Sequence, residues 1–312
     1  MAEKASEKVL VDVEGHRLTL SNLGKVLYPQ AGFSKGEIID YYTRIAPVLL
    51  PHLADRPLTV KRYPGGVDAS FFFEKNAPRG TPSWVRTATL PAPGSTKNRE
   101  TIDYVVVEQL PTLVWLANLA ALELHVPQWR VPKRARKPRT DTLVFDLDPG
   151  PPATIAECCE VALALRELLE ADGFAPTPKT SGSKGMQVSA PIEVDDPDRP
   201  SKYAHLLARR LERRLPKLVV SKMAKELRPR KVFVDWSQNN PAKTTVAPYS
   251  LRAKATPTVS TPLTWAEVAA GGAISFTAPE VLDRVADHGD LWAAVLDDER
   301  RGRLPATLVT DE

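Results

Sequence analysis

The segment Thr142-Leu-Val-Phe-Asp-Leu-Asp-Pro-Gly150 carries two acidic residues in an otherwise apolar run. Its apolar residues are typical of a β-strand, and because side chains alternate across a strand, Asp146 and Asp148 should share one face. The Pro-Gly pair should end the strand and leave both carboxylates at its mouth. Neighbouring carboxylates repel unless a cation lies between them, and Mg²⁺ or Mn²⁺ binds carboxylates together with phosphate oxygens. The segment thus indicates either a metal site for phosphoryl or nucleotidyl transfer or a strand end with two solvated acids.

The composition is that of a chain with enough apolar residues for a sizeable core. The 312 residues are 43% hydrophobic, and a net charge of +4 with a pI of about 9.0 is compatible with a polyanionic partner. A short segment before the acidic strand is strongly basic and is either a solvated loop or a phosphate-contacting one. Its basic residues are Arg130, Lys133, Arg134, Arg136, Lys137 and Arg139.

Cysteine usage and targeting signals point to the cytoplasm. The only cysteines, Cys158 and Cys159, are adjacent in sequence and predict neither a disulfide framework nor a metal cluster. The sequence shows no signal peptide and no apolar run long enough to span a bilayer. We therefore expect a cytoplasmic protein without a membrane partner.

A glycine-rich segment, Thr180-Ser-Gly-Ser-Lys-Gly185, is the second informative stretch. Gly182 and Gly185 allow a tight turn whose backbone N–H groups can point at one anion, and Ser181, Ser183 and Lys184 add donors and a positive charge. The spacing differs from that of a P-loop. The segment predicts a phosphate cradle or, as the alternative, an ordinary hairpin turn with a solvated lysine.

A third acid lies in the apolar segment Lys231-Val-Phe-Val-Asp-Trp236. An acid in so apolar a strand needs a partner or a metal, so Asp235 is the expected third metal ligand. Three carboxylates can hold two divalent ions about 3.5–4 Å apart, one at the attacking oxygen and one at the leaving group. The polar segment that follows carries residues suited to anion binding, among them Gln238, Lys243 and Arg252.

The remaining pattern mixes strands and helices. Three capping boxes predict helix starts, at Ser34–Glu37, Thr154–Glu157 and Thr264–Glu267. Leucines between 113 and 122 predict a further helix, with His125 just past its end, and the three phenylalanines at 71–73 favour core packing over base stacking. Since helices and strands do not alternate regularly, the pattern favours an α+β fold.

Six ordered motifs give the chain a specific family resemblance over nearly its whole length. It resembles the polymerase domain of bacterial ATP-dependent DNA ligase D and its stand-alone relatives, within the archaeo-eukaryotic primase superfamily. The motifs are Phe72-Phe-Glu-Lys75, Leu124-His-Val-Pro-Gln-Trp129, Val144-Phe-Asp-Leu-Asp-Pro-Gly150, Thr180-Ser-Gly-Ser-Lys-Gly185, Lys231-Val-Phe-Val-Asp-Trp-Ser-Gln238 and the segment from Lys243 to Arg252.

The resemblance implies a primase-polymerase fold, with mixed β-sheets flanked by helices, as a single catalytic domain over residues 1–312. The N-terminal part, to about residue 130, would carry the template and 5′-phosphate surface, and residues 131–312 the metal and triphosphate site. The implied function is a template-dependent polymerase that fills short gaps or extends ends in bacterial DNA break or excision repair and favours ribonucleotides. The implied cofactors are two Mn²⁺ or Mg²⁺ ions, and the implied partners are gapped or broken DNA with a 5′-phosphate, nucleoside triphosphates, a DNA ligase and Ku. We expect a monomer associated with the nucleoid.

The resemblance also implies roles for individual residues. Asp146, Asp148 and Asp235 would bind the two ions, and Asp235 would help deprotonate the primer hydroxyl. Phe72 and Phe73 would stack on a template or incoming base, contrary to the preference for core packing above. Gln238 would lie beside the sugar or base. The triphosphate would be held by His125, Ser181, Lys184, Arg228, Lys243 and Arg252, and the DNA 5′-phosphate by Asn22, Lys25 and Lys35.

One position departs from the family pattern. The family usually has a histidine two residues after the glycine-rich turn, where this chain has Gln187. Glutamine cannot take up a positive charge, so triphosphate contacts or proton handling should be weaker, and a stand-alone paralogue used in gap repair is indicated. Two other functions stay open: a metal-dependent nuclease, which would use the same acids, and a catalytically weak module that binds DNA gaps or ends.

Overall fold

The computed structural model describes residues 8–92, 100–131, 139–194, 196–272 and 274–306, without the side chain of residue 139. Helices and strands follow one another without regular alternation, which confirms the predicted α+β class. The α-helices in these ranges are α1 (Lys35–Leu53), α2 (Leu110–Asn118), α3 (Ile155–Ala171), α4 (Arg199–Arg214), α5 (Trp265–Ala270) and α6 (Ala278–His288). The 3₁₀ turns include η2 (Lys225–Leu227), η3 (Trp236–Asn239) and η4 (Ala293–Leu296).

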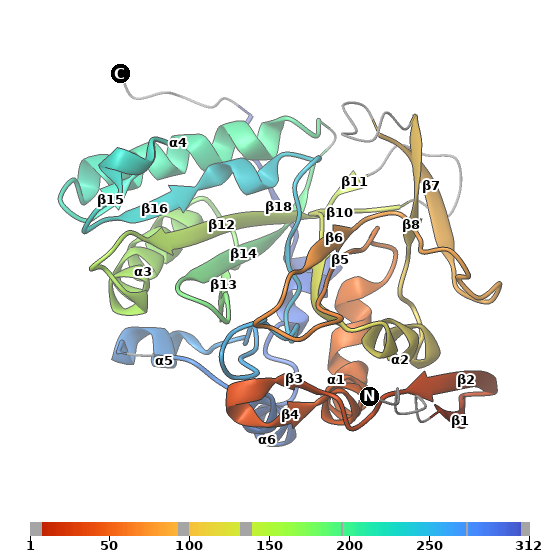
Figure 1. Ribbon diagram of the computed structural model, residues 1–312. Helices are drawn as coiled ribbons and strands as arrows, with labels where there is room; N and C mark the ends of the chain where they lie inside the picture. The colour runs from red at the N-terminus through yellow and green to blue at the C-terminus, as the bar shows by residue number, and fades with distance from the viewer. Residues whose placement is uncertain (1–7, 93–99, 132–138, 195, 273, 307–312) are drawn as a thin grey trace.

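The largest sheet holds β12 (Thr142–Pro149), β13 (Thr177–Thr180), β14 (Met186–Glu193), β15 (Val219–Val220), β16 (Val232–Asp235) and β18 (Gly302–Arg303). Its order is β13-β14-β12-β16-β15, with β18 beside β14 (Figure 1). Alternation along β12 sends Leu143, Phe145 and Leu147 into a core shared with α3 and α4. The two acids of β12 therefore face away from that core.

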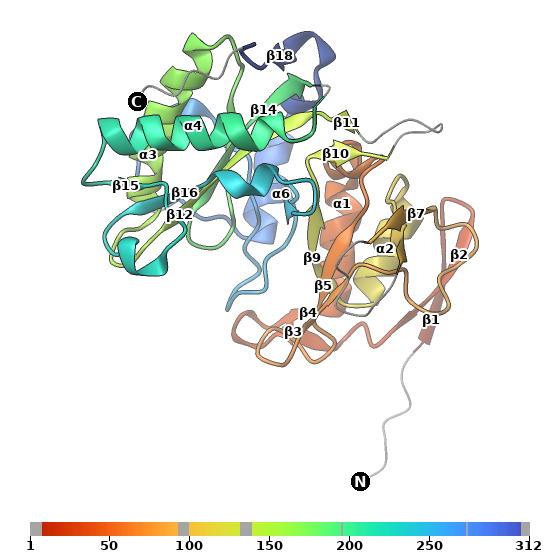
Figure 2. The ribbon, with the colours of Figure 1, turned by 90° about the horizontal axis from the view of Figure 1, so that it is seen from above.

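A second sheet forms the neighbouring part of the fold. It contains β5 (Thr59–Arg62), β6 (Phe72–Glu74), β9 (Ala121–Val126) and β17 (Thr245–Val246), in the order β17-β9-β5-β6. Residues of α1 and α2 share its apolar core, and seen from above β5 and β9 lie beside these helices and next to the larger sheet (Figure 2). Because β17 follows β16 in the chain, it places the C-terminal half directly against β9.

Four two-stranded hairpins complete the described strands. They pair β1 (Lys8–Val13) with β2 (His16–Ser21), β3 (Val26–Tyr28) with β4 (Phe33–Ser34), β7 (Thr87–Pro91) with β8 (Thr101–Val105), and β10 (Trp129–Arg130) with β11 (Arg139–Thr140). The basic residues 133–137, which we considered as a phosphate-contacting loop, lie outside the described residues. Of the same group, Arg130 is paired with a carboxylate, because its Nε donates to Asp141 Oδ2 at 2.7 Å.

The three predicted capping boxes are confirmed. Ser34, Thr154 and Thr264 begin α1, α3 and α5, each with the reciprocal glutamate contact expected of the motif. The helix predicted over residues 113–122 is wrong at its end. The helix α2 stops at Asn118, Ala120 adopts a φ of +59°, and β9 begins at the next residue. His125 is therefore a strand residue, and it shares a face with the residue two positions before it.

A buried ion pair joins the two parts of the fold. Nη2 of Arg56, just after α1, donates to both carboxylate oxygens of Asp141 at 2.8 and 2.9 Å, just before β12. Its Nη1 donates to the carbonyl of Pro127 at 3.0 Å. Both residues are only 5% exposed, so removing Arg56 leaves the buried Asp141 with Arg130 as its remaining counter-charge.

We predict that Arg56→Met lowers the free energy of unfolding by about 3–5 kcal/mol, as breakage of a buried pair typically does. Urea denaturation measures the change. Arg44→Met is the control, because Arg44 lies within α1 and pairs with Asp40 on the exposed surface. A loss no larger than that of the control would contradict the proposed importance of the pair.

The same pair predicts a pH dependence of stability. Burial opposes ionisation of Asp141, but the charges of Arg56 and Arg130 outweigh it and hold the pKa of this carboxyl below its ordinary value. A depressed pKa stabilises the fold above the pKa of the unfolded carboxyl, about 4, and this contribution is lost as the pH falls through the folded pKa. Below about pH 4 the free energy of unfolding of the wild type should therefore fall more steeply with decreasing pH than that of Arg56→Met. Equal slopes for the two proteins would contradict a stabilising role of the ionised Asp141.

Candidate active site

Three acids far apart in the sequence meet on one face of the largest sheet. Asp146 and Asp148 are two residues apart on β12, and Asp235 ends the neighbouring strand β16. In the antiparallel register of these strands, Asp146 pairs directly with Asp235. Residues directly opposite in such a pair have Cβ atoms about 4.5–5.5 Å apart. The fold thus brings together the three residues that the sequence analysis assigned to a metal site.

These acids destabilise one another's charged forms. Burial and the charge of Asp148 raise the pKa of Asp146 to about 7. Burial and the charge of Asp235 also raise the pKa of Asp148. Carboxyls with raised pKa values gain from a nearby cation, and oxygen ligands of this kind are the ones that Mg²⁺ and Mn²⁺ prefer. The donor set fits the divalent ions implied by the resemblance.

The side chains are not yet arranged around an ion. Across the described ranges, no three His, Cys, Asp or Glu side chains lie close enough together to hold a metal ion as they stand. Asp146 and Asp235 instead accept hydrogen bonds: Gln187 Nε2 donates to Asp146 Oδ1 at 3.1 Å, and Gln238 Nε2 donates to Asp235 Oδ2 at 2.9 Å. The backbone register nevertheless places these two acids directly opposite each other on adjacent strands.

A cavity of about 240 Å³ lies beside the acids and is lined by most of the residues predicted to hold a triphosphate. The glycine-rich turn forms one wall, where Ser181 Oγ accepts the backbone N–H groups of Ser183 and Gly185, each at 3.3 Å. A Cβ at position 185 would lie 2.0 Å from the carbonyl oxygen of Leu147, so only glycine lets this turn approach β12 so closely. The predicted residues on the lining are His125, Asp146, Asp148, Ser181, Lys184, Gln238 and Arg252, together with Gln187.

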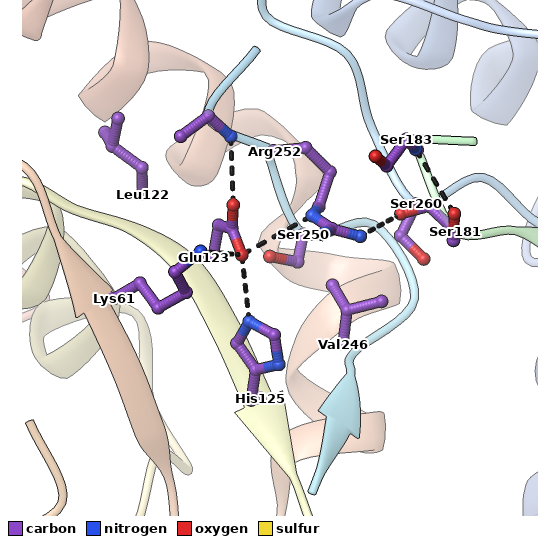
Figure 3. Close-up of polar contacts among 12 residues, drawn as sticks. Lys61, Leu122, Glu123, His125, Ser181, Ser183, Val246, Ser250, Arg252 and Ser260 are labelled. Carbon is purple, nitrogen blue, oxygen red and sulfur yellow. Dashed lines mark hydrogen bonds and ion pairs between the residues drawn. The ribbon is translucent and has the colours of Figure 1, made fainter. Parts of the chain in front are cut away.

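A buried carboxylate that the sequence analysis missed organises the cationic wall of this cavity (Figure 3). Glu123 lies two residues before His125 on β9 and is 2% exposed. Its Oε2 is 3.0 Å from Nε2 of His125, 3.4 Å from Nζ of Lys61 and 3.5 Å from Nε of Arg252. Burial opposes its ionisation, but the hydrogen bond from His125 and the charges of Arg252 and Lys61 keep its pKa well below the ordinary value.

Glu123 has two consequences for its neighbours. It holds together the two cations Lys61 and Arg252, which would otherwise repel each other. It also fixes the imidazole of His125 with Nε2 toward the carboxylate. Burial lowers the pKa of His125, so the neutral ring is favoured, with Nε2–H donating to Glu123. The alternation Glu-Leu-His within an apolar segment was the available signal for this pair, but the sequence analysis placed His125 after a helix rather than in a strand.

The phenylalanine segment corrects one sequence-based preference. Core packing was favoured for residues 71–73, but Phe71, Phe72 and Phe73 are 47%, 44% and 61% exposed. Nζ of Lys61 lies 4.3 Å from the ring centroid of Phe71, which combines a cation with exposed aromatic faces. Phe72 and Phe73 line a groove of about 750 Å³ that shares Thr244 with the smaller cavity. The placement agrees with the stacking alternative rather than with a core role.

Arg228 and Lys243 lie at the rim of the acidic cluster rather than on the cavity lining. The guanidinium of Arg228 lies 3.8 Å from the ring centroid of Phe233, which pairs with Asp148 across the strands, and its charge favours ionisation of Asp148. Lys243 Nζ donates to the hydroxyl of Ser237, and that hydroxyl donates to Asp235. Both cations therefore lie close to the acids.

A second cationic group lies around the start of α1. The backbone N–H of Lys25 donates to the carbonyl of Asn22 at 3.0 Å, and that of Lys35 donates to the carbonyl of Lys25 at 2.8 Å. Burial and the charge of Lys25 lower the pKa of Lys35 to about 8, so an anion would relieve strain between two neighbouring lysines. These residues line none of the cavity beside the acids.

Two further sequence expectations concern localisation. Cys158 and Cys159 are both free and buried. Within the described ranges, no helix combines the length and the apolar character needed to cross a bilayer.

Comparison with known proteins identifies the family. The family model described as "LigD, primase-polymerase domain" matches residues 34–292. The multifunctional non-homologous end joining protein LigD of Mycolicibacterium smegmatis is 44% identical over 278 residues, covering 89% of this chain and 36% of that protein. The bifunctional non-homologous end joining protein LigD of Bacillus subtilis is 32% identical over 276 residues, covering 88% of this chain and 43% of that protein. The chain thus spans well under half the length of these relatives.

A solved structure extends the similarity to the fold. The polymerase domain from Mycobacterium tuberculosis ligase D in complex with DNA aligns with a TM-score of 0.85 and 44% identity, covering 90% of this chain and 99% of that one. The predicted primase-polymerase fold is therefore confirmed. The family model covers most of the chain, and sequence and structure agree. The chain belongs to the LigD primase-polymerase domain family, which is a family of nucleotidyltransferases.

Proposed function

We propose that this chain is a template-dependent polymerase that adds nucleotides, ribonucleotides included, to a 3′ end across short DNA gaps or at broken ends. The observation that carries the proposal is the pairing of Asp146 with Asp235 in register, beside a cavity lined by anion-binding side chains. Acids alone would serve a nuclease equally well. The adjoining group of cations around Glu123 suits a triphosphate, which carries more negative charge than a single phosphodiester.

The proposed roles follow from position. Asp146, Asp148 and Asp235 would hold two Mn²⁺ or Mg²⁺ ions, which supply charge neutralisation at the attacking and leaving oxygens when bound. Asp235 would also accept the primer hydroxyl's proton, and Gln238 would orient the sugar or base. Phe72 and Phe73 would stack on a base. The triphosphate would be held by His125, Ser181, Lys184, Arg228, Lys243 and Arg252.

Gln187 bears on the alternative of a catalytically weak DNA-binding module. Its amide donates to Asp146 rather than standing free in the cavity. A residue that orients a metal-binding acid is compatible with an active enzyme, so the absence of the family's histidine does not by itself favour the weak module.

The biological setting is part of the same proposal. We infer action on DNA with a 5′-phosphate, in the cytoplasm at the nucleoid, in end joining or excision repair with a DNA ligase and Ku as partners. The relatives named for non-homologous end joining support this setting. The two lysines near the start of α1, with Asn22, would bind the 5′-phosphate, and the protein would act as a monomer.

We predict that the wild-type chain, given Mn²⁺, a gapped primer-template and labelled nucleotides, lengthens the primer, and that Asp146→Asn abolishes the lengthening. Asp283→Asn, an exposed acid on α6, is the control and should retain activity. Gel analysis with ribo- and deoxyribonucleotides in parallel tests sugar preference. Shortened primers would instead support a nuclease, and binding without any change in length would support the weak module.

Glu123→Gln should raise KM for the nucleotide about tenfold or more with a smaller effect on kcat, because it removes the charge that holds His125, Lys61 and Arg252 in place. Steady-state primer-extension kinetics at saturating Mn²⁺ measure KM and kcat separately. Glu267→Gln is a matched control, since Glu267 also pairs with an arginine, Arg284, but lies on α5 and outside the cavity lining. An unchanged KM would refute the organising role of Glu123.

The 5′-phosphate assignment predicts a selective loss of affinity. The double variant Lys25→Ala with Lys35→Ala should bind gaps bearing a 5′-phosphate about tenfold more weakly, because two neighbouring positive charges are removed. Fluorescence anisotropy on paired substrates with and without that phosphate measures the effect. The assignment fails if both substrates weaken equally.

A further inference from the structure

A buried lysine that none of the proposed steps uses lies in line with the acids. Lys179, on β13, is 2% exposed. It pairs directly with Gln187 on β14, Gln187 pairs with Asp146 on β12, and Asp146 pairs with Asp235 on β16. The four residues therefore form one row across four adjacent strands, perpendicular to the chain direction.

Three hydrogen-bond acceptors surround the amino group of Lys179. Its Nζ donates to Gln187 Oε1 at 2.6 Å, to Ser260 Oγ at 2.6 Å and to the carbonyl of Val246 at 3.1 Å. The hydroxyl hydrogen of Ser260 is already donated to the carbonyl of Thr180. Three acceptors match the three N–H groups of an ammonium, although burial lowers the pKa of Lys179 to about 7.

This arrangement decides which way the amide of Gln187 points. As an ammonium, Lys179 can only donate at this position, so Gln187 turns its oxygen toward the lysine. Its Nε2 then faces Asp146 and donates to Oδ1 at 3.1 Å. The opposite orientation would set two donors against each other at Lys179 and two oxygens against each other at Asp146.

We propose that Lys179 is a positioning residue for the metal-binding acid Asp146, acting through the amide of Gln187, which it locks in the donating orientation. The inference rests on the proposed two-metal function and deepens it. A carboxylate held by a fixed donor loses less freedom when it binds a cation, so the row should strengthen metal binding. In this proposal Gln187 acts on the metal-binding acid Asp146 rather than on the triphosphate.

Direct binding of Mn²⁺ tests the proposal without relying on catalysis. Free Mn²⁺ is measured by electron paramagnetic resonance during titration of the full chain without nucleotide, and thermal stability is measured on the same samples. Lys179→Met, which keeps the side-chain length and removes the donor, should weaken Mn²⁺ binding about tenfold. Gln187→Leu should also weaken Mn²⁺ binding about tenfold. The double variant should bind Mn²⁺ no more weakly than either single variant, because both substitutions break the same chain of hydrogen bonds.

Val188→Ala is the matched control for stability. Val188 adjoins Gln187 on β14 but is buried in the core on the opposite face, so its truncation destabilises the same sheet without touching the row. We expect it to lower the melting temperature and leave Mn²⁺ affinity unchanged. If Lys179→Met does not fold, Gln187→Leu alone tests the proposal. Lys179 keeps its hydrogen bonds to Ser260 and Val246 in that variant, and its Mn²⁺ binding should still be about tenfold weaker.

Two outcomes would overturn the proposal: Mn²⁺ affinity in Lys179→Met and Gln187→Leu equal to that of the control, or additive losses in the double variant. Its failure is distinct from failure of the proposed function. A wild-type chain that binds Mn²⁺ and extends primers, with variants that bind Mn²⁺ equally well, refutes only the positioning role. A wild-type chain that neither binds Mn²⁺ nor extends primers refutes the function itself.

Discussion

Asp146 and Asp235 face each other across a β-pair in register, with Asp148 two residues further along the same face of the sheet. Bringing three carboxylates so close raises the free energy of the fold, as the raised pKa values of Asp146 and Asp148 indicate. The register is imposed from the other face, where Phe145 and Leu147 pack into the core with α3 and α4. The packing of that core therefore holds the three carboxylates together despite their mutual repulsion.

Positive charge is concentrated on the facing wall of the cavity, where it is held by a carboxylate of its own. Glu123 pairs with Lys61 and Arg252, keeps these two cations from repelling each other, and orients the neutral imidazole of His125. An anion carrying divalent cations complements both walls at once, its phosphates against the cations and its metal ions against the acids.

Sequence patterns predicted the acids because they depend on local rules. Alternation along a strand placed Asp146 and Asp148 on one face, and an acid in an apolar strand singled out Asp235. Capping boxes predicted three helix starts for the same local reason. The glycine and serine content of residues 180–185 likewise predicted a phosphate cradle. Family resemblance supplied the stacking role of the exposed phenylalanines, for which apolar content alone had favoured the core.

What the sequence could not supply is register between strands. Lys179 and Gln187 are eight positions apart, and Asp146 is far from both, so their alignment in one row depends on how β13, β14 and β12 pair. Glu123 escaped notice because the break at Ala120, which turns helix into strand, has no glycine or proline to mark it. In both cases the missing information is tertiary, since packing of the sheets selects the pairing and the break.

Crystallographic location of manganese tests the central claim most directly. Crystals of the chain soaked with Mn²⁺ and a nucleoside triphosphate, measured at the manganese absorption edge, should give two anomalous peaks bounded by Asp146, Asp148 and Asp235. Peaks elsewhere, or a triphosphate bound in the cavity with these three carboxylates free of metal, would contradict the account.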